Sequence, residues 1–316
     1  MMLRLAIKQI NMTITNLQKS FWAMTLSSFF GALIAVSIKA LSFHTSISVI
    51  FFFTRIFLLL GVIPTFMRYR STLFEIHNWF GMIIMSVLYV AAFYCYFYSL
   101  ALVPLAISSL LINSAPLYVP IIAFFVLKDM AIKSKILWLT MLISFAGVIL
   151  VLSPNGKAHY SFVGFVLAFL SGILLAASQV FTKWVTKNHQ PHHIAFFQTI
   201  MSIIITFFPA FFIVAHHGVD YLSGLFTFNN TAMLILCGIS SWIYQLYRAK
   251  AMTFASVSFA MPFGYLGVVF VGILDLIFWD VLPDAISIIG MIVVMIGVIL
   301  SLKLSKKVAE QSDPLV

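Results

Sequence analysis

The chain has 316 residues, of which 63% are hydrophobic and 8% charged, and its formal net charge is +10. Soluble domains carry about 25% charged residues, so this composition excludes a protein that faces water on all sides. No basic stretch is interleaved with exposed aromatic residues, so we expect no nucleic-acid partner. Loops that face anionic lipid headgroups explain the positive charge better, and membrane lipid is the expected surrounding.

The first 19 residues are predicted to form a cytoplasmic amphipathic leader and not a cleaved signal peptide. Apolar residues at helical spacing take one side of this segment, and basic or polar residues take the other. The apolar set is Leu3, Ile7, Ile10, Ile14 and Leu17, and the polar set is Arg4, Lys8, Asn11, Thr15 and Lys19. This pattern predicts a short helix on the membrane surface; a disordered basic leader is the alternative.

Ten long apolar segments follow the leader. They cover residues 20–40, 47–66, 78–100, 103–126, 134–152, 161–183, 193–215, 230–251, 254–278 and 284–303. Each approaches the roughly 20 residues that a helix needs to cross the hydrocarbon core. Continuous apolar runs without strict alternation exclude a membrane β-barrel. The sequence therefore predicts an all-α integral membrane protein with ten transmembrane helices.

The basic residues fall on alternate sides of these segments, which predicts their orientation. Fifteen of the 18 Lys and Arg residues lie before the first span or near or beyond the end of an even-numbered one. They are Arg4, Lys8, Lys19, Arg68, Arg70, Lys128, Lys133, Lys135, Lys183, Lys187, Arg248, Lys250, Lys303, Lys306 and Lys307. Since Lys and Arg near helix ends stay in the cytoplasm, we expect both termini to be cytoplasmic and the protein to lie in the cytoplasmic (inner) membrane.

The two halves of the chain resemble each other in order. The run 52–56 matches 196–200, Lys39 aligns with Lys183, Tyr98 with Tyr247, and the run 147–150 matches 297–300. The repeats are predicted at residues 20–152 and 161–303, followed by a cytoplasmic tail at 304–316. Five spans per copy invert the second copy in the membrane, an arrangement found in secondary transporters.

These features resemble the drug/metabolite transporter superfamily in its EamA-type branch, over about residues 20–303. The matching elements are Lys39 at the end of the first span, Arg55 within the second, Tyr98-x-x-Ala101-Leu102, Ala106-x-Ser108-Ser109-Leu110-Leu111, Ala115-Pro116 and Gly147-Val148-Ile149-Leu150. Where the family usually has Glu after the fourth span, this chain has Lys128-Asp129, with Asp280 as its second-half counterpart.

The resemblance implies a small-metabolite transporter of the cytoplasmic membrane with a central cavity between its halves. Relatives carry amino acids, nucleotide-linked metabolites such as S-adenosylmethionine, sugars and drugs. Both uptake and export occur among them, so the resemblance fixes neither substrate nor direction.

Arg55 is the sharpest single candidate for substrate binding. It lies near the middle of the second span, where an arginine costs about 2.5–3.5 kcal/mol unless it faces the protein interior or a wet cavity. It either binds a carboxylate or phosphate of the substrate or caps helix-end carbonyls. Lys39 is expected to snorkel to the interface, with a gating or substrate contact as the alternative.

Prolines interrupt the fourth and ninth spans at corresponding places. Pro116 and Pro262 mark these breaks, and interrupted helices in both halves are a pointer to a transporter binding site. Asn113 and Tyr118 flank the first break and Tyr265 lies at the second, so all three are candidate substrate contacts. Simple kinks that pack helices are the alternative.

The third and eighth spans present aromatic and polar faces at helical spacing. Tyr89, Phe93 and Tyr96 share one face, and Trp242 and Gln245 occupy matching positions in the other half. Such residues supply an apolar wall with hydrogen-bonding tips, which suits organic metabolites. In the sixth span, Gln179 is expected to bond either another helix or the substrate.

Acidic residues are scarce in the spans, and Asp275, toward the outer end of the ninth, is the nearest to mid-membrane. A proton relay needs a chain of ionisable groups, so we expect a facilitator or exchanger. No phosphate loop, nucleophile elbow or metal-ligand cluster occurs in the sequence, so no catalytic residue, metal or cofactor is predicted.

The sequence therefore predicts a secondary transporter that moves a small organic metabolite by alternating access. An amino acid or an amino-acid-derived nucleoside such as S-adenosylmethionine is the first expectation, because both carry a carboxylate for Arg55. A drug or other metabolite exporter of the same fold is the main alternative. A membrane-embedded enzyme for lipid intermediates and a non-transporting scaffold are alternatives from other classes. The protein is expected to be a monomer or homodimer.

Overall fold

The computed structural model describes residues 2–42, 45–69, 73, 77–100, 102–103, 105–152, 161–280 and 282–311. In these residues the chain forms helices and connecting loops and no strand. Arg70, Lys157, Ala101 of the matching motif and residues 312–316 of the predicted tail lie outside the described residues.

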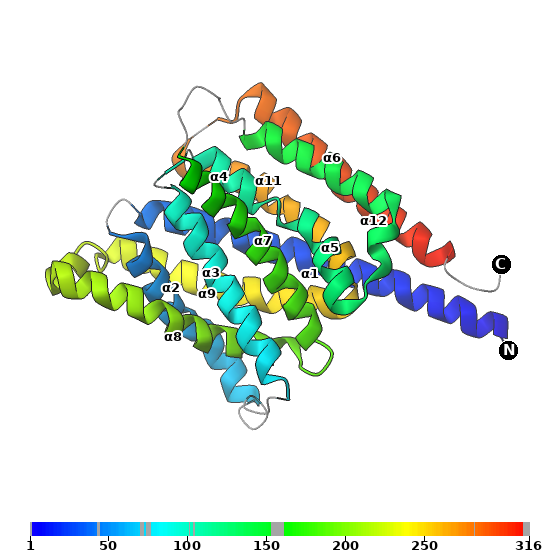
Figure 1. Cartoon of the computed structure of the whole chain (residues 1–316), viewed down its shortest axis with the longest axis horizontal. Coiled ribbons are helices and arrows are strands. Elements are labelled where there is room, and N and C mark those ends of the chain that lie inside the picture. Colours follow the sequence, from blue (N-terminus) through cyan, green and yellow to red (C-terminus); the bar gives the residue numbers. More distant parts are fainter. Residues whose placement is uncertain are drawn as a thin grey trace.

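The elements follow one another as two series of five spans (Figure 1). The first series is α1 (Met2–Leu41), α2 (Ile47–Tyr69), α3 (Trp79–Leu100), α4 (Leu105–Ile112) with α5 (Ala115–Leu127), and α6 (Lys135–Leu152). The second is α7 (Phe162–Val185), α8 (Pro191–His217), α9 (Phe228–Phe254), α10 (Val257–Ala260) with η3 (Met261–Tyr265) and α11 (Leu266–Trp279), and α12 (Ala285–Gln311). Short 3₁₀ turns η1 (Met130–Lys133) and η2 (Val219–Leu222) lie in loops.

Nine spans in the described residues are long and apolar enough to cross a membrane, counting α4 with α5 and α10 through α11 as one span each. The tenth, α9, has 27 residues but carries a polar stripe that includes the buried Ser241, Gln245 and Arg248. It packs along α1 and α2, so this stripe is shielded from lipid and the usual cost of polar groups in hydrocarbon is reduced. The predicted all-α membrane fold is confirmed.

The leader is not a separate helix. α1 runs from Met2 to Leu41 without interruption, because neither Gly nor Pro occurs between Met2 and Gly31 to end it. Figure 1 shows α1 extending from the body of the molecule toward the N-terminus. That this extension lies on the membrane surface stays a prediction.

The same helix pairing occurs twice, and in the second pair each helix is replaced by its counterpart from the other half of the chain. α1 packs along α9, and their counterparts α7 and α3 pack along each other. α6 packs along its own counterpart, α12, as Figure 1 shows at the upper edge of the molecule. Two inverted copies related by a two-fold axis in the membrane plane produce this interleaving.

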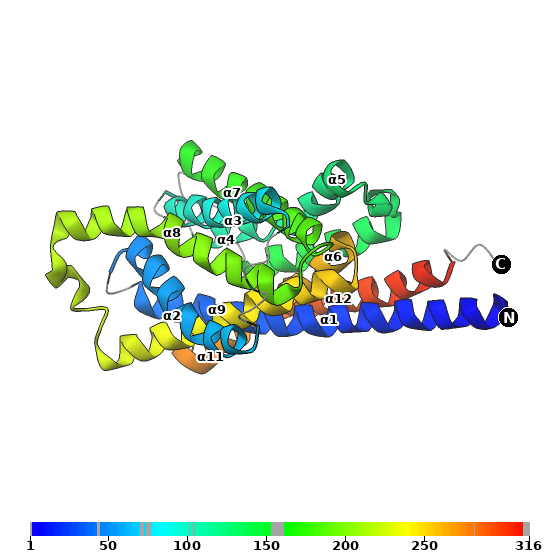
Figure 2. The same cartoon turned by 90° about the horizontal axis from the view of Figure 1, so that it is seen from below.

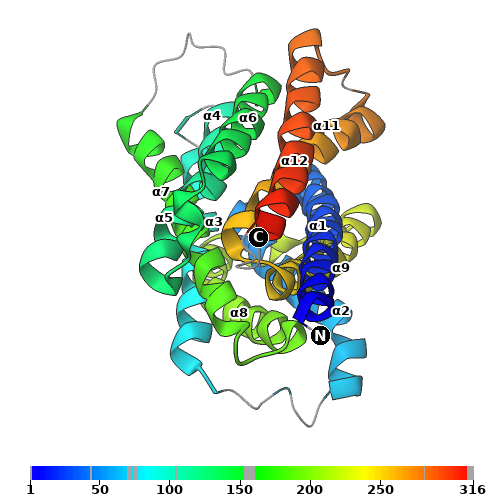
Figure 3. The same ribbon diagram turned by 90° about the vertical axis from the view of Figure 1, so that its right-hand side faces the viewer.

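The helices separate into two sides that mix both halves of the sequence. We call α1, α2, α9 and α11 the α1 side, and α3, α4, α5 and α7 the α3 side. Figure 3 shows the α3 side on the left and the α1 side on the right, with α6 and α12 above them and α8 below. Figure 2 shows α1 and α9 running side by side beneath α3 and α7.

A glycine contact joins α6 to α12. A Cβ added to Gly147 would lie 2.6 Å from the backbone nitrogen of Val294 and 2.7 Å from the carbonyl oxygen of Gly290. Small residues let membrane helices approach backbone to backbone. The α6–α12 pair is therefore held by direct backbone contact and ties the two halves together.

Both predicted helix breaks are present. Pro116 lacks an amide hydrogen and its ring clashes with the carbonyl four residues earlier, so the fourth span ends at Ile112 and resumes as α5. Pro262 has the same effect in the ninth span, where the 3₁₀ segment η3 separates α10 from α11. Neighbouring helices pack against both breaks, because Gly172 of α7 abuts the carbonyl of Leu111 and Ser28 of α1 bonds the carbonyl of Gly264 at 3.4 Å.

Candidate functional site

A cavity of about 380 Å³ lies between the two sides. From the α1 side it is lined by Gly31, Ile34, Ala35, Val36, Ile38, Lys39, Ser42, Ile47, Phe51, Arg55, Tyr244, Val271 and Asp275, and from the α3 side by Tyr89, Phe93, Tyr96, Phe97 and Ser109. It runs from the middle of α2 to the adjoining ends of α1 and α2. Helices of both halves therefore contribute to one concave, mostly apolar site, as expected for a small-molecule pocket.

Arg55 provides a positive charge in the wall of this cavity. Its side chain is 2% exposed, and its guanidinium carbon lies 4.5 Å from the centre of the Phe51 ring and 5.9 Å from that of Tyr89. The Nε and Nη1 groups have no hydrogen-bond partner. These aromatic contacts stabilise the cation in part, but the guanidinium retains donors for an anion.

The position predicted for Arg248 from the sequence was wrong. The charge pattern counted it among cytoplasmic loop residues, yet it lies inside α9 and is 1% exposed. Its guanidinium carbon lies 5.2 Å from the centre of the Tyr89 ring and 5.1 Å from that of Tyr244. Nη1 donates to the hydroxyl of Tyr244 at 3.0 Å, while Nε and Nη2 have no partner. A second cation therefore lies directly behind two tyrosines of the cavity wall.

The aromatic face predicted for the third span forms much of the wall. Tyr89, Phe93 and Tyr96 all line the cavity, and the Tyr89 and Phe93 ring centres are 4.9 Å apart. The Tyr96 hydroxyl bonds Ser109 Oγ at 3.0 Å. Tyr244, from the eighth span, completes the wall opposite them. The site can therefore hold an organic body against rings and an acidic group against guanidinium.

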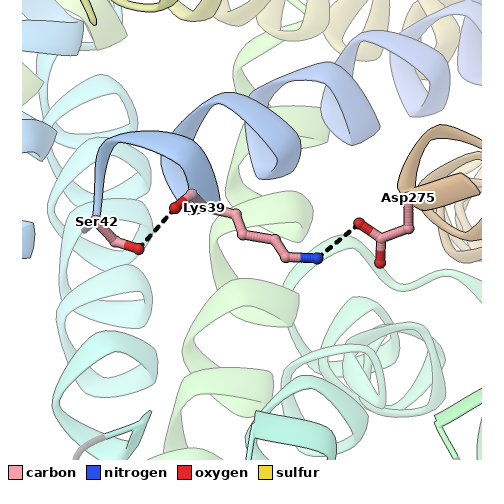
Figure 4. A network of polar contacts seen from close by, with 3 residues as sticks. All are labelled: Lys39, Ser42 and Asp275. Carbon is pink, nitrogen blue, oxygen red and sulfur yellow. Dashed lines mark hydrogen bonds and ion pairs between the residues drawn. The ribbon is translucent and has the colours of Figure 1, made fainter. Parts of the chain in front are cut away.

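Lys39 and Asp275 form an ion pair at the other end of the cavity. Lys39 Nζ lies 2.9 Å from Asp275 Oδ1, and the two side chains are 39% and 30% exposed. Figure 4 shows Lys39 reaching from α1 to Asp275 on α11, while Ser42 Oγ donates to the Lys39 carbonyl at 2.8 Å. A carboxylate on the neighbouring helix thus holds the ammonium group of Lys39 at the cavity, and both snorkelling to the interface and a gating or substrate contact stay predictions.

Three further candidates lie outside the wall of this cavity. Trp242 is 4% exposed and packs over Gly61, where an added Cβ would come within 2.7 Å of its side chain. Gln245 and Gln179 are buried, and side-chain atoms of both have no hydrogen-bond partner. All three point to packed regions between helices, and their contact with substrate stays a prediction.

The residues at the helix breaks also lie outside the wall. Asn113 Nδ2 donates to the carbonyl of Ser109 at 2.7 Å, and the Tyr118 hydroxyl accepts from Ser114 Oγ at 3.2 Å. Tyr265 is 1% exposed. Pro116 and Pro262 therefore shape the packing of neighbouring helices, and a direct role of these residues in binding stays a prediction.

Hydrogen bonds join neighbouring helices at the end of the molecule opposite Lys39. Lys183 of α7 donates to the carbonyl oxygens of Met252 and Ala255 at the end of α9, at 2.5 and 2.8 Å. Ser258 Oγ of α10 donates to Asp129 Oδ2 at 2.9 Å. Lys183 thus caps helix-end carbonyls of the α1 side and joins the two sides at this end.

The sequence model of the EamA-like transporter family matches residues 18–153 and again residues 162–303. The chain belongs to the EamA-like transporter family. Members of this family are transporters, so the protein is a multi-pass membrane transporter and not an enzyme.

Known relatives agree with this assignment. The pseudopaline exporter CntI of Pseudomonas aeruginosa, strains UCBPP-PA14 and PAO1, is 24% identical over 216 residues, which is 68% of this chain and 71% of the exporter. A solved structure described only as "Crystal structure of protein" matches with a TM-score of 0.71 at 15% identity and covers 92% of this chain and 99% of its own. The structural likeness supports the fold of this transporter and says nothing of its substrate.

Proposed function

We propose that this transporter moves a small organic anion of the amino-acid type across the cytoplasmic membrane by alternating access, and that Arg55 binds the acidic group. The observation that carries the proposal is a buried guanidinium in the cavity wall with two N–H-bearing nitrogens lacking a partner. A buried charge is costly unless it is paired. An anionic substrate supplies the missing partner and leaves Arg55 fully hydrogen-bonded.

The rest of the wall supports an amino-acid-type substrate. Phe93, Phe97 and Tyr96 offer an apolar and aromatic surface for a side group. The carboxylate of Asp275 lies in the same cavity and is an acceptor for a substrate ammonium group. An amino-acid-derived nucleoside such as S-adenosylmethionine has the same groups, with a base that can stack on the rings.

The arrangement of the two sides supports alternating access as the mechanism. The cavity extends to Lys39 and Asp275 at one end, whereas Lys183 joins the two sides at the other end, and inverted repeats can rock about a central site. The positive-inside pattern supports cytoplasmic termini, so the Lys39 end is the external one. The exporter named among the relatives favours export as the direction.

The test compares two arginines of the same helix. Arg55→Ala in proteoliposomes is expected to abolish counterflow of labelled amino acids while membrane insertion and the size-exclusion profile remain unchanged. Arg55→Lys should retain part of the activity, because a charge remains. Arg68→Ala, an exposed position near the end of α2, is the matched control and should transport like the parent protein. Normal anion transport by Arg55→Ala would refute the assignment.

A further inference from the structure

Two buried guanidinium groups share one aromatic ring next to the cavity. The guanidinium carbons of Arg55 and Arg248 lie 5.9 and 5.2 Å from the centre of the Tyr89 ring. The distance between the two carbons therefore cannot exceed the sum of these values. Both side chains are almost fully buried, at 2% and 1% exposure, so two like charges are concentrated in a weakly solvated region.

The described carboxylates do not neutralise this pair. Asp275 is bound to Lys39, Asp129 accepts from Ser258 and from the amide of Ala131, and the remaining described acidic side chains, Asp220, Asp280 and Asp284, are exposed. Each arginine keeps two nitrogens without a hydrogen-bond partner. Nearby like charges raise each other's energy, so this region favours more negative charge than one carboxylate provides.

A relative movement of the two sides would make the second guanidinium reachable. Tyr89 belongs to the α3 side, whereas both arginines belong to the α1 side. Tyr244, which accepts a hydrogen bond from Arg248, already lines the cavity. A rocking motion that draws Tyr89 away from the guanidinium groups would let an acidic group take the place of the ring. An ion pair with bidentate hydrogen bonds is stronger than the cation–π contact that it replaces.

We propose that the substrate carries two acidic groups and that Arg248 binds the second, which makes Arg248 the residue that selects diacids over monoacids. This inference rests on the proposed function, in which Arg55 binds the first group. The substrate class is then an organic dicarboxylate of amino-acid type, small enough for a cavity of about 380 Å³.

Matched pairs of probes separate one acidic group from two. Inhibition constants for counterflow would be measured for glutarate against valerate and for glutamate against glutamine, since each pair has similar size and differs in one carboxylate. The parent protein is expected to prefer the diacid by roughly 10-fold or more, the value of one charged hydrogen-bonded contact. A parent protein without this preference would overturn the proposal.

The variants distinguish this inference from the proposed function. Arg248→Gln should lose the preference for the diacid while its inhibition constant for the monoacid changes less than about two-fold, and Arg248→Lys should keep part of the preference. Arg55→Gln should weaken both members of each pair. If Arg248→Gln folds but weakens monoacid and diacid equally, Arg248 is structural and the inference is wrong. If Arg55→Gln leaves both unchanged, the proposed function itself fails.

Discussion

Replacing Lys183 should favour opening of the transporter at the Lys183 end. The Lys183 ammonium group joins α7 to the carbonyls of Met252 and Ala255, and so connects the α3 side to the end of α9. Met fills a similar volume but donates no hydrogen bond. Lys183→Met therefore removes a contact made when this end is closed and leaves the helix carbonyls unmatched.

The size of the effect follows from these two bonds. Hydrogen bonds to charged groups contribute about 1.5–3 kcal/mol each when buried. Lys183 is only half-buried, and water replaces part of the interaction, so we take about 1.5–3 kcal/mol for both bonds together. This energy corresponds to a roughly 10- to 150-fold increase in the population open at the Lys183 end.

A cysteine reporter measures that population. Gln179 lies one turn before Lys183 on α7 and is 5% exposed, so Gln179→Cys in a background with Cys95→Ser and Cys237→Ser reports access from that end. Lys183→Met should increase its labelling rate by an impermeant thiol reagent applied from the predicted cytoplasmic side. Lys187→Met, an exposed lysine four residues on, is the control.

Two outcomes would refute this reasoning. An unchanged labelling rate in Lys183→Met would mean that the two hydrogen bonds do not hold the end closed. An equal increase in the Lys187 variant would mean that any loss of positive charge near this end changes reagent access.

Two further predictions concern stability. Gly147→Val should lower the free energy of unfolding by about 1–3 kcal/mol, because the valine side chain would overlap the α12 backbone. The control is Gly267→Ala, where the atom nearest to the added Cβ is 3.7 Å away. Equal thermal unfolding midpoints of the two variants in detergent would contradict this prediction. His189 Nε2 accepts from the amide of His77 at 3.0 Å, and burial lowers the pKa of His189 below its usual 6.5. Folding therefore favours the neutral form of His189. Its contribution to the free energy of unfolding is fully present above pH 6.5 and is lost as the pH falls through the lowered pKa. The unfolding midpoint should fall on acidification below pH 6.5, and His189→Gln should flatten that dependence; identical pH profiles would exclude this role.

Much of the fold can be predicted from the amino-acid composition and from the order of apolar and basic segments along the chain. Apolar runs of membrane-spanning length can satisfy their backbone only as helices, and the alternating basic residues predict their orientation. The cavity wall formed by Arg55, Tyr89, Phe93 and Tyr96 was also predictable, because a helical face of polar aromatic residues and a mid-span arginine both require an interior position.

Arg248 was missed because its sequence position suits two environments. It lies near the predicted end of a span at residue 251, where an arginine normally reaches the headgroups. Only the packing of α9 within the bundle, along α1 and α2 and with Tyr89 of α3 against the guanidinium, encloses it. The available signal was the stripe Ser241, Gln245 and Arg248 at i, i+4 and i+7, which marks one polar face of a helix otherwise surrounded by apolar neighbours.

Trp242 and Gln245 lie outside the cavity wall because the two repeats do not contribute equivalent faces to it. They were expected to mirror the aromatic face of the third span, but the cavity is lined differently by the two copies. Tyr89, Phe93 and Tyr96 of the first half line the cavity, whereas Trp242 and Gln245 of the second half are buried in packed regions between helices. Sequence repeats predict two equivalent faces, and the conformation of the protein decides which of them meets the cavity.

The charges break the same symmetry. In the inverted alignment, Arg55 corresponds to Thr199 and Arg248 to Ser99, and both of these hydroxyls donate to carbonyls of their own helices, Ala195 and Tyr96, at 2.7 and 2.6 Å. The duplicated scaffold thus provides the two sides that would rock under the proposed mechanism, whereas the guanidinium groups of Arg55 and Arg248 both reside on the α1 side. An anion bound there would keep its strongest contacts while the α3 side moves past it. Selectivity and motion would then depend on different helices, so a variant such as Arg248→Gln can alter which substrate is carried while the Lys183 contact still governs which end is open.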